Sequence, residues 1–120
     1  MNLVETPLMR TLSHALDLTS VRQGLVTQNV ANIDTPGYRT QDIDFRQELQ
    51  RALADDEGPA AAPLVREVSG LIERPDGNNV NLDRESLLMA QNQLAFQVDV
   101  QLLRAEFNRL QLAINGGSGQ

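Results

Sequence analysis

The feature that most restricts the fold is a run of helix-forming residues from Asp83 to Ile114. As a helix, this run would be about 48 Å long at 1.5 Å per residue. Placed at about 100° per residue, its apolar side chains form three ridges instead of one stripe. The main ridge contains Met89, Phe96, Val100, Leu103, Phe107, Leu110 and Ile114. One partner helix cannot cover three ridges, so the sequence predicts packing among several neighbours.

The other faces of this helix differ in chemistry. The second ridge contains Leu87, Leu94, Val98, Ala105 and Leu112, and the third ridge contains Leu88, Ala95, Leu102 and Ala113. The polar face is mostly uncharged and contains Asp83, Ser86, Gln93, Gln97, Gln101, Arg104, Asn108 and Gln111. Asn81 or Asp83 is expected to cap the start of the helix, and Asn115-Gly116-Gly117 to end it.

A first long helix is predicted from Pro7 to Ile33, with Thr6 as the N-cap and Pro7 at the first helical position. Two polar residues, Arg22 and Asn29, fall inside its apolar stripe and therefore need partners. The helix should stop before Pro36, because the residue before a proline is pushed away from the helical region. Gly37 then suits a tight turn.

Residues 38–82 have a different character. A short helix is expected over Phe45–Ala54, and the acidic, Pro-rich stretch 55–63 predicts a solvated flexible loop. Residues 65–72 are expected to form a short strand, returning through residues 80–82 as a hairpin after a turn at 74–78. The organisation is then an N-terminal helix and turn (1–37), an irregular middle segment (38–82) and a C-terminal helix and tail (83–120).

Composition excludes several classes of function. The net charge is −6, lysine is absent and the arginines do not cluster, so binding to nucleic acid or to an anionic lipid surface is not expected. The absence of cysteine excludes disulfides and thiol chemistry. The first 25 residues lack the pattern of a cleavable signal peptide, and no stretch of some 18 apolar residues occurs. These patterns predict a soluble chain without direct lipid insertion.

Neither catalysis nor a metal or cofactor site is predicted. His14 is the single histidine and has no suitably placed partner for general base chemistry, so packing or surface exposure is favoured. Residues 76–83 superficially resemble a calcium loop, but Val80 and Leu87 stand where ligands are required. A turn followed by a helix cap is the favoured interpretation of this stretch.

One string carries a family resemblance. Asn29-Val30-Ala31-Asn32-Ile33-Asp34-Thr35-Pro36-Gly37-Tyr38-Arg39 resembles the N-terminal signature of bacterial flagellar rod and hook proteins. Later segments make the chain most similar to the proximal rod proteins of the basal body. These segments are Asp42-Ile43-Asp44-Phe45, residues 74–80 and Met89-Ala90-Gln91-Asn92-Gln93-Leu94. The resemblance extends from about Leu8 to Gly116.

The resemblance implies an elongated all-α fold, in which N- and C-terminal helices pack side by side, coiled-coil-like, in the inner tube of a rod. It also implies helices that become ordered on assembly, and a periplasmic position in the flagellar basal body. Export by the flagellar type III apparatus without cleavage is implied as well. Phe45 and Leu49 resemble an export element, although an amphipathic helical turn explains them equally well. The implied partners are further copies of the chain, other rod proteins, a FliE-type adaptor at the MS ring and the export gate.

The resemblance and the ridges together predict a structural subunit whose helices form a tube that is also an export channel. The residues expected at its interfaces are Arg22, Asn29, Asn32, Asp34, Tyr38, Phe96, Leu103 and Phe107. The alternative is a soluble coiled-coil adaptor or chaperone that binds one helical client. An adaptor should be stably helical at low concentration, whereas a rod subunit should gain helicity on assembly.

Overall fold

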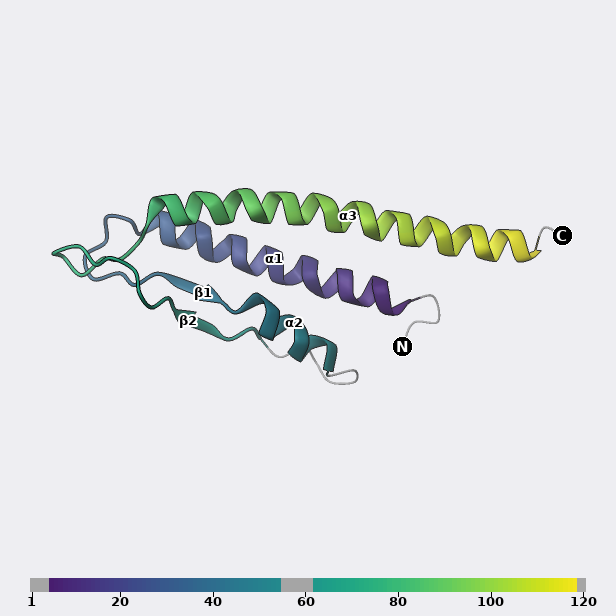
Figure 1. Cartoon of the computed structure of the whole chain (residues 1–120), viewed down its shortest axis with the longest axis horizontal. Helices are drawn as coiled ribbons and strands as arrows, with labels where there is room; N and C mark the ends of the chain where they lie inside the picture. Colours follow the sequence, from purple (N-terminus) through teal and green to yellow (C-terminus); the bar gives the residue numbers. More distant parts are fainter. Residues whose placement is uncertain (1–4, 55–61, 119–120) are drawn as a thin grey trace.

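The computed structural model describes residues 5–54 and 62–118. The chain is elongated, with extents of 71 × 28 × 19 Å. Its elements are α1 (Pro7–Ala31), β1 (Gln41–Ile43), α2 (Phe45–Ala54), β2 (Val65–Glu67) and α3 (Leu82–Ser118). In Figure 1, α1 is the middle layer, with α3 along one side and α2 and the two strands along the other. The predicted fold, with two long terminal helices side by side and a short irregular middle segment, is confirmed.

Helix α1 begins as predicted and ends slightly earlier. Thr6 is the N-cap and accepts a hydrogen bond from the Met9 N–H, and Pro7 occupies the first helical position. The helix ends at Ala31, two residues before the predicted Ile33, with Asn32 as its C-cap. The chain tightens here because the Ile33 N–H bonds to the Val30 carbonyl, three residues back instead of four. Gly37 has a φ of 75°, in agreement with the predicted turn.

Helix α3 is longer than predicted. It starts at Leu82, with the Asn81 side chain accepting from the Arg84 N–H, which confirms Asn81 as a cap. The predicted end near Ile114 is wrong, because the helix continues through Gly116 and Gly117 to Ser118. Glycine lowers helix stability but does not break the hydrogen-bonding pattern as proline does.

The predicted hairpin pairs the wrong segments. Strand β2 is antiparallel to β1, with Gln41 opposite Glu67 and Ile43 opposite Val65, and it does not pair with residues 80–82. The turn at residues 74–77 does form, since the Gly77 N–H bonds to the Arg74 carbonyl. Residues 78–80 instead lie beside residues 38–40, where the Asn79 N–H donates to the Tyr38 carbonyl. The side chains of this segment therefore serve contacts with the end of α1 and the start of β1.

The middle segment packs on one face of α1. Helix α2 has the bounds predicted for it. Phe45 and Leu49 on α2 pack against a core of Leu18, Leu25 and Ile43. This packing explains how one side of α1 is covered. The loop predicted for residues 55–63 lies almost entirely outside the described residues.

The face of α3 that packs on α1 is unexpectedly polar. Its buried residues are Glu85, Leu88, Asn92 and Glu106, at helical spacing on one side. Asn92 donates to the Gln23 side chain of α1 at 3.1 Å. Phe96, Phe107 and Ile114 of the main ridge are each about half exposed. The most apolar surfaces of α3 thus remain available outside the α1–α3 contact.

Candidate assembly surfaces

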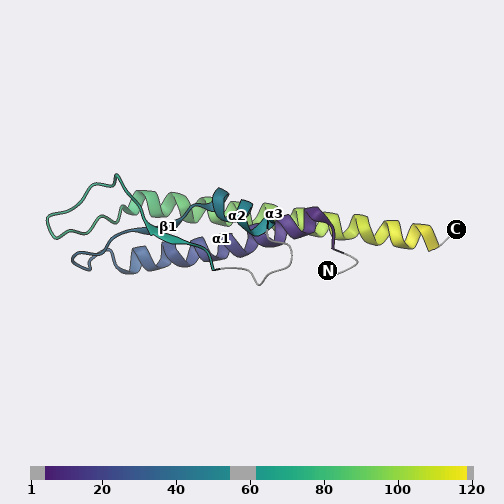
Figure 2. The same cartoon turned by 90° about the horizontal axis from the view of Figure 1, so that it is seen from below.

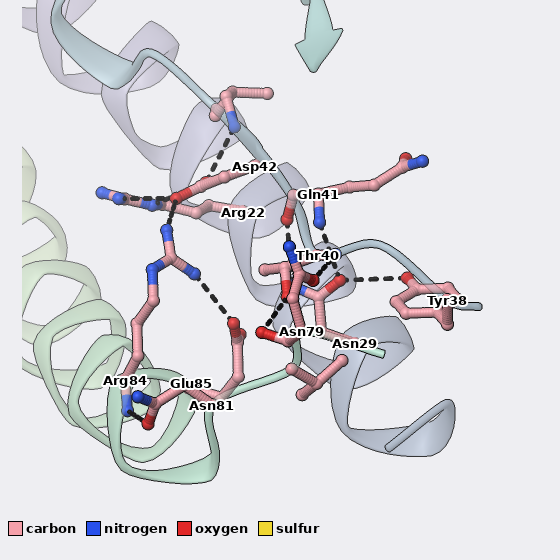
Figure 3. A network of polar contacts seen from close by, with 12 residues as sticks. Arg22, Asn29, Tyr38, Thr40, Gln41, Asp42, Asn79, Asn81, Arg84 and Glu85 are labelled. Carbon is pink, nitrogen blue, oxygen red and sulfur yellow. Dashed lines mark hydrogen bonds and ion pairs between the residues drawn. The ribbon is translucent and has the colours of Figure 1, made fainter. Parts of the chain in front are cut away.

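The end of the molecule where α1 turns and α3 begins is held by polar side chains. We call residues 29–43 together with 74–85 the junction. Asn29, at 1% exposure, is its centre (Figure 3). The Asn29 amide nitrogen donates to the Gln41 carbonyl at 2.9 Å, and its oxygen accepts from the Gln41 N–H at 3.1 Å. The Asn29 side chain thus binds both backbone groups of Gln41, as a neighbouring strand would bind β1.

Tyr38 connects the turn to the same amide. Its hydroxyl donates to Asn29 Oδ1 at 3.0 Å. Burial, followed by the nearby negative charge of Glu85, raises the pKa of Tyr38 above its ordinary value. Tyr38 therefore stays a neutral hydroxyl that can donate this hydrogen bond.

Asp42 joins both long helices to β1. Arg22 of α1 donates to both carboxylate oxygens at 3.0 Å, and Arg84 of α3 donates to one of them at 2.6 Å (Figure 3). The Ile43 N–H also binds this carboxylate, at 2.7 Å. Burial alone would raise the pKa of Asp42, but these hydrogen bonds and positive charges hold it below its ordinary value. One carboxylate thus fixes α1 against α3.

Two further buried amide side chains, those of Asn78 and Asn79, also make hydrogen bonds within the junction. Asn78 donates to the carbonyls of Asn32 and Thr35 at 2.9 and 2.8 Å, which satisfies groups at the end of α1. Asn79 Oδ1 accepts from the Thr40 N–H at 2.7 Å. Glu85 is fully buried and binds Arg84 at 2.8 Å. The resemblance string is therefore stabilised by residues more than forty positions away in the sequence.

The predicted interface residues fall into two groups. Arg22, Asn29, Asn32 and Tyr38 make contacts within the chain, and the Asn32 side chain binds the Gln28 carbonyl and the Thr35 hydroxyl. Asp34 is exposed in the turn. On α3, Phe96 and Phe107 are 51% and 52% exposed. The role of all these residues between subunits stays a prediction.

Leu103 lies in a different setting from the other two α3 positions. It is partly buried and lines an open cleft of about 560 Å³ between the start of α1 and α3. Met9, Ser13 and Phe107 line the same cleft. A substitution at Leu103 would therefore disturb the α1–α3 contact as well as any outer surface.

The two residues of the predicted export element are engaged within the fold. Phe45 and Leu49 are partly buried against the core cluster. Their packing is what an amphipathic helical turn requires. A role in export stays a prediction, and it would require this turn to leave the core.

The sequence predicts no contact for several residues that define the junction, although Asp42, Asn78 and Asn79 belong to segments that carry the resemblance. These residues are Thr40, Asp42, Asn78, Asn79, Arg84 and Glu85. One signal for Asp42 was available, because Arg22 inside an apolar stripe needs an acidic partner and Asp42 precedes the buried Ile43. No local pattern pairs Asn79 with Thr40, since that contact depends on the tertiary fold.

Among the described residues, most of the exposed large apolar side chains lie on α3. The second ridge lies on the side turned away from α1, with Leu87, Leu94 and Leu112 at 59%, 63% and 72% exposure. In α1, by contrast, Leu8 is the one large apolar residue that is exposed among the described residues. No helix within residues 5–54 and 62–118 is long and apolar enough to cross a membrane. An apolar ridge of this length on a helix is typical of a surface that packs against other protein chains.

Comparison with known proteins identifies the class. The family model described as flagella basal body rod protein matches residues 9–39, which span most of α1 and the turn to Arg39. This segment contains the resemblance string and its central amide, Asn29. The matched class is that of structural components of the flagellar basal body.

Relatives that match over nearly their whole length identify the family within this class. The flagellar basal body rod protein FlgB of Salmonella typhimurium is 32% identical, over 92% of this chain and 94% of the relative. FlgB of Cereibacter sphaeroides is 34% identical over 87% and 91%, and FlgB of Bacillus subtilis 30% over 91% and 94%. The chain belongs to the FlgB family of flagellar basal body rod proteins.

Proposed function

We propose that this chain is a non-enzymatic subunit of the proximal rod, and that it polymerises through α1 and α3 into the tube that also forms the export channel. The observation that carries this proposal is the exposed apolar surface of α3, including Leu94 at 63% and Leu112 at 72% exposure. Burying such side chains is favourable, and one chain alone leaves them in water. Family membership supports the same assignment.

The partners proposed are further copies of the chain, the other rod proteins, a FliE-type adaptor at the MS ring and the type III export gate. The rod would lie in the periplasm, reached by export without a cleaved signal peptide. Support for this position comes from the relatives, which are named as flagellar basal body rod proteins. The junction would keep α1 and α3 in a fixed relation, so that each copy presents its surfaces in the same way.

A charge placed on the second ridge tests the proposal. Leu94→Asp should leave the isolated chain folded, because Leu94 is mostly exposed, but should abolish incorporation into basal bodies and motility. The matched control is Gln93→Asp, on the neighbouring polar face, which should preserve both. The measurements are swimming on soft agar and the chain content of isolated basal bodies, in cells that lack their own copy.

Two results would count against the assignment. Normal basal bodies with Leu94→Asp would show that this surface is not used for assembly. Absence of the parent chain from basal bodies, together with tight binding of one helical client at low concentration, would favour the adaptor alternative.

A further inference from the structure

The exposed face of α1 is made of short or polar side chains. They recur every three or four residues and therefore share one side of the helix. They are Ser13, Asp17, Ser20, Gly24, Thr27, Gln28 and Ala31. Beyond its first turn, where Leu8 is exposed, the rest of α1 is covered by α3, α2 and β1. This one face is therefore the part of α1 that another molecule can approach.

Gly24 lies in the middle of this face, and nothing in its own chain requires a glycine. Its φ is not positive, and a Cβ placed there would meet no atom within 4 Å among the described residues. Glycine inside a helix is less favourable than alanine, since it loses more backbone freedom on folding. A glycine that the fold does not use, on an open helix face, permits close approach of a neighbouring helix.

The second ridge of α3 has the complementary shape. Leu87, Leu94, Val98 and Leu112 are 45% to 72% exposed along about 37 Å of helix. These are large side chains in a row, whereas the α1 face offers small ones. Ridges of large side chains pack into the grooves that smaller side chains leave.

Charges favour the same pairing. Exposed acidic residues, Glu5 and Asp17, lie in or just before the first half of α1. The basic residues of the second half of α3 are Arg104 and Arg109, both exposed, with Arg109 also bound to Glu106. Because α1 and α3 are antiparallel (Figures 1 and 2), a copy in the same orientation brings these acidic residues toward the two arginines. Arg10 also lies in this half of α1, where it donates to the Ala52 and Leu53 carbonyls of α2.

We propose that the face of α1 around Gly24 receives the second ridge of α3 from a second copy of the chain. This contact joins two different surfaces, so it repeats from copy to copy and builds an open or ring-shaped array instead of a closed pair. The inference rests on the proposed function and deepens it by naming the two faces that meet. Phe96 remains for other neighbours, and the cleft adjoins this contact at Ser13.

Cysteine cross-linking tests the contact, since the chain has no cysteine of its own. Cells lacking their own copy would express two tagged versions, one with Gly24→Cys and one with Leu94→Cys. Isolated basal bodies would then be oxidised, and disulfide-linked dimers of the two versions measured. A Cα separation below about 7 Å is needed for the bond. The matched control replaces Leu94→Cys with Gln93→Cys, its exposed neighbour on the polar face.

The expected result is a mixed dimer at least tenfold more abundant with Leu94→Cys, or with Val98→Cys one turn further along, than with Gln93→Cys. Chain present in basal bodies without this preference would overturn the inference and leave the proposed function standing. Chain absent from basal bodies in the unsubstituted form would overturn both.

A second variant separates packing from folding. Gly24→Leu should make the isolated chain at least as helical as the parent, because leucine is the better helix former and the site is open. It should nevertheless cause loss of swimming and at least a tenfold fall in basal-body incorporation. Gln93→Leu adds the same side chain to α3 and should swim normally. Normal swimming of Gly24→Leu would overturn the inference, whatever its helicity.

Discussion

The two ends of this molecule are stabilised in opposite ways. At the junction, polar side chains such as Asn29, Asn78 and Asp42 are buried and bound to partners within the chain. In the second half of α3, large apolar side chains such as Phe107, Leu112 and Ile114 are more than half exposed. The junction makes most of its polar contacts within a single chain, although Asn79 Nδ2 and Glu85 Oε2 are buried there without a hydrogen-bond partner among the described residues. The other end presents apolar surface that only neighbours can cover.

The contrast suggests where order depends on assembly. Local stability follows burial and hydrogen bonding, and both are concentrated at the junction. A chain that gains structure on polymerising would then do so mainly in α3 beyond about residue 100, with residues 29–43 and 74–85 ordered beforehand. Each prediction below changes one side of this comparison.

The largest effect is expected at Asn29. Asn29→Ala removes three hydrogen bonds and leaves the backbone groups of Gln41 and the Tyr38 hydroxyl without that partner. The loss should be about 3 kcal/mol of unfolding free energy, because buried polar groups left unpaired are costly. Hydrogen exchange of the amides of residues 38–43 should accelerate about a hundredfold.

The matched change at the other end is Leu112→Ala. Because Leu112 is 72% exposed, the unfolding free energy of the isolated chain should stay within about 0.5 kcal/mol of the parent. Equal losses for the two variants would contradict the contrast between the ends.

How far the sequence predicts the molecule also differs between these regions. The helices and the cap at Thr6 follow from local rules, since periodicity and capping residues act over a few positions. Helical periodicity also predicts the three apolar ridges of α3. Local rules do not predict which side of α3 packs on α1: the contact buries Glu85, Leu88 and Asn92, and only part of the main ridge, such as Leu103, lies at its edge.

The junction shows why the partners of its polar residues cannot be predicted from the sequence. The apolar stripe of α1 identifies Asn29 and Arg22 as polar residues that need partners. Their partners, the Gln41 backbone and Asp42, depend on β1 lying along α1, and β1 was not predicted. The nearby turn favours pairing of β2 with residues 80–82. The Thr40 N–H and hydroxyl instead donate to Asn79, which holds that segment beside the start of β1.

After Asn29→Ala, the next largest loss of unfolding free energy is expected for Asp42→Asn. This change keeps the shape of the side chain but removes the negative charge between Arg22 and Arg84, which are 25% and 22% exposed. Leaving two partly buried arginines without that charge should cost about 2 kcal/mol at pH 7. Urea unfolding of both chains measures the difference. No change at pH 7 would show that the carboxylate contributes shape alone.

The pH dependence of the same site has a definite sign. The pKa of Asp42 is lowered in the folded chain, so its contribution is present above the ordinary pKa and is lost as pH falls through the folded value. The junction should therefore weaken below about pH 5. The protection of the amides of residues 38–43, relative to their intrinsic exchange rate at pH 3 and at pH 7, measures this. Asp42→Asn should show a smaller difference in protection between the two pH values.

A small effect is expected in the middle of the α1–α3 contact. Burial raises the pKa of Asp99 on α3, because removal from water disfavours the charged carboxylate. Its contribution is present below the ordinary pKa and is lost as pH rises through the folded value, the reverse of Asp42. Asp99→Asn should therefore raise the midpoint of thermal unfolding slightly at pH 7 and leave it unchanged at pH 3. A lowered midpoint at pH 7 would mean that the Asp99 charge has a favourable partner across the contact, and that the middle of α3 resembles the junction more than its exposed end.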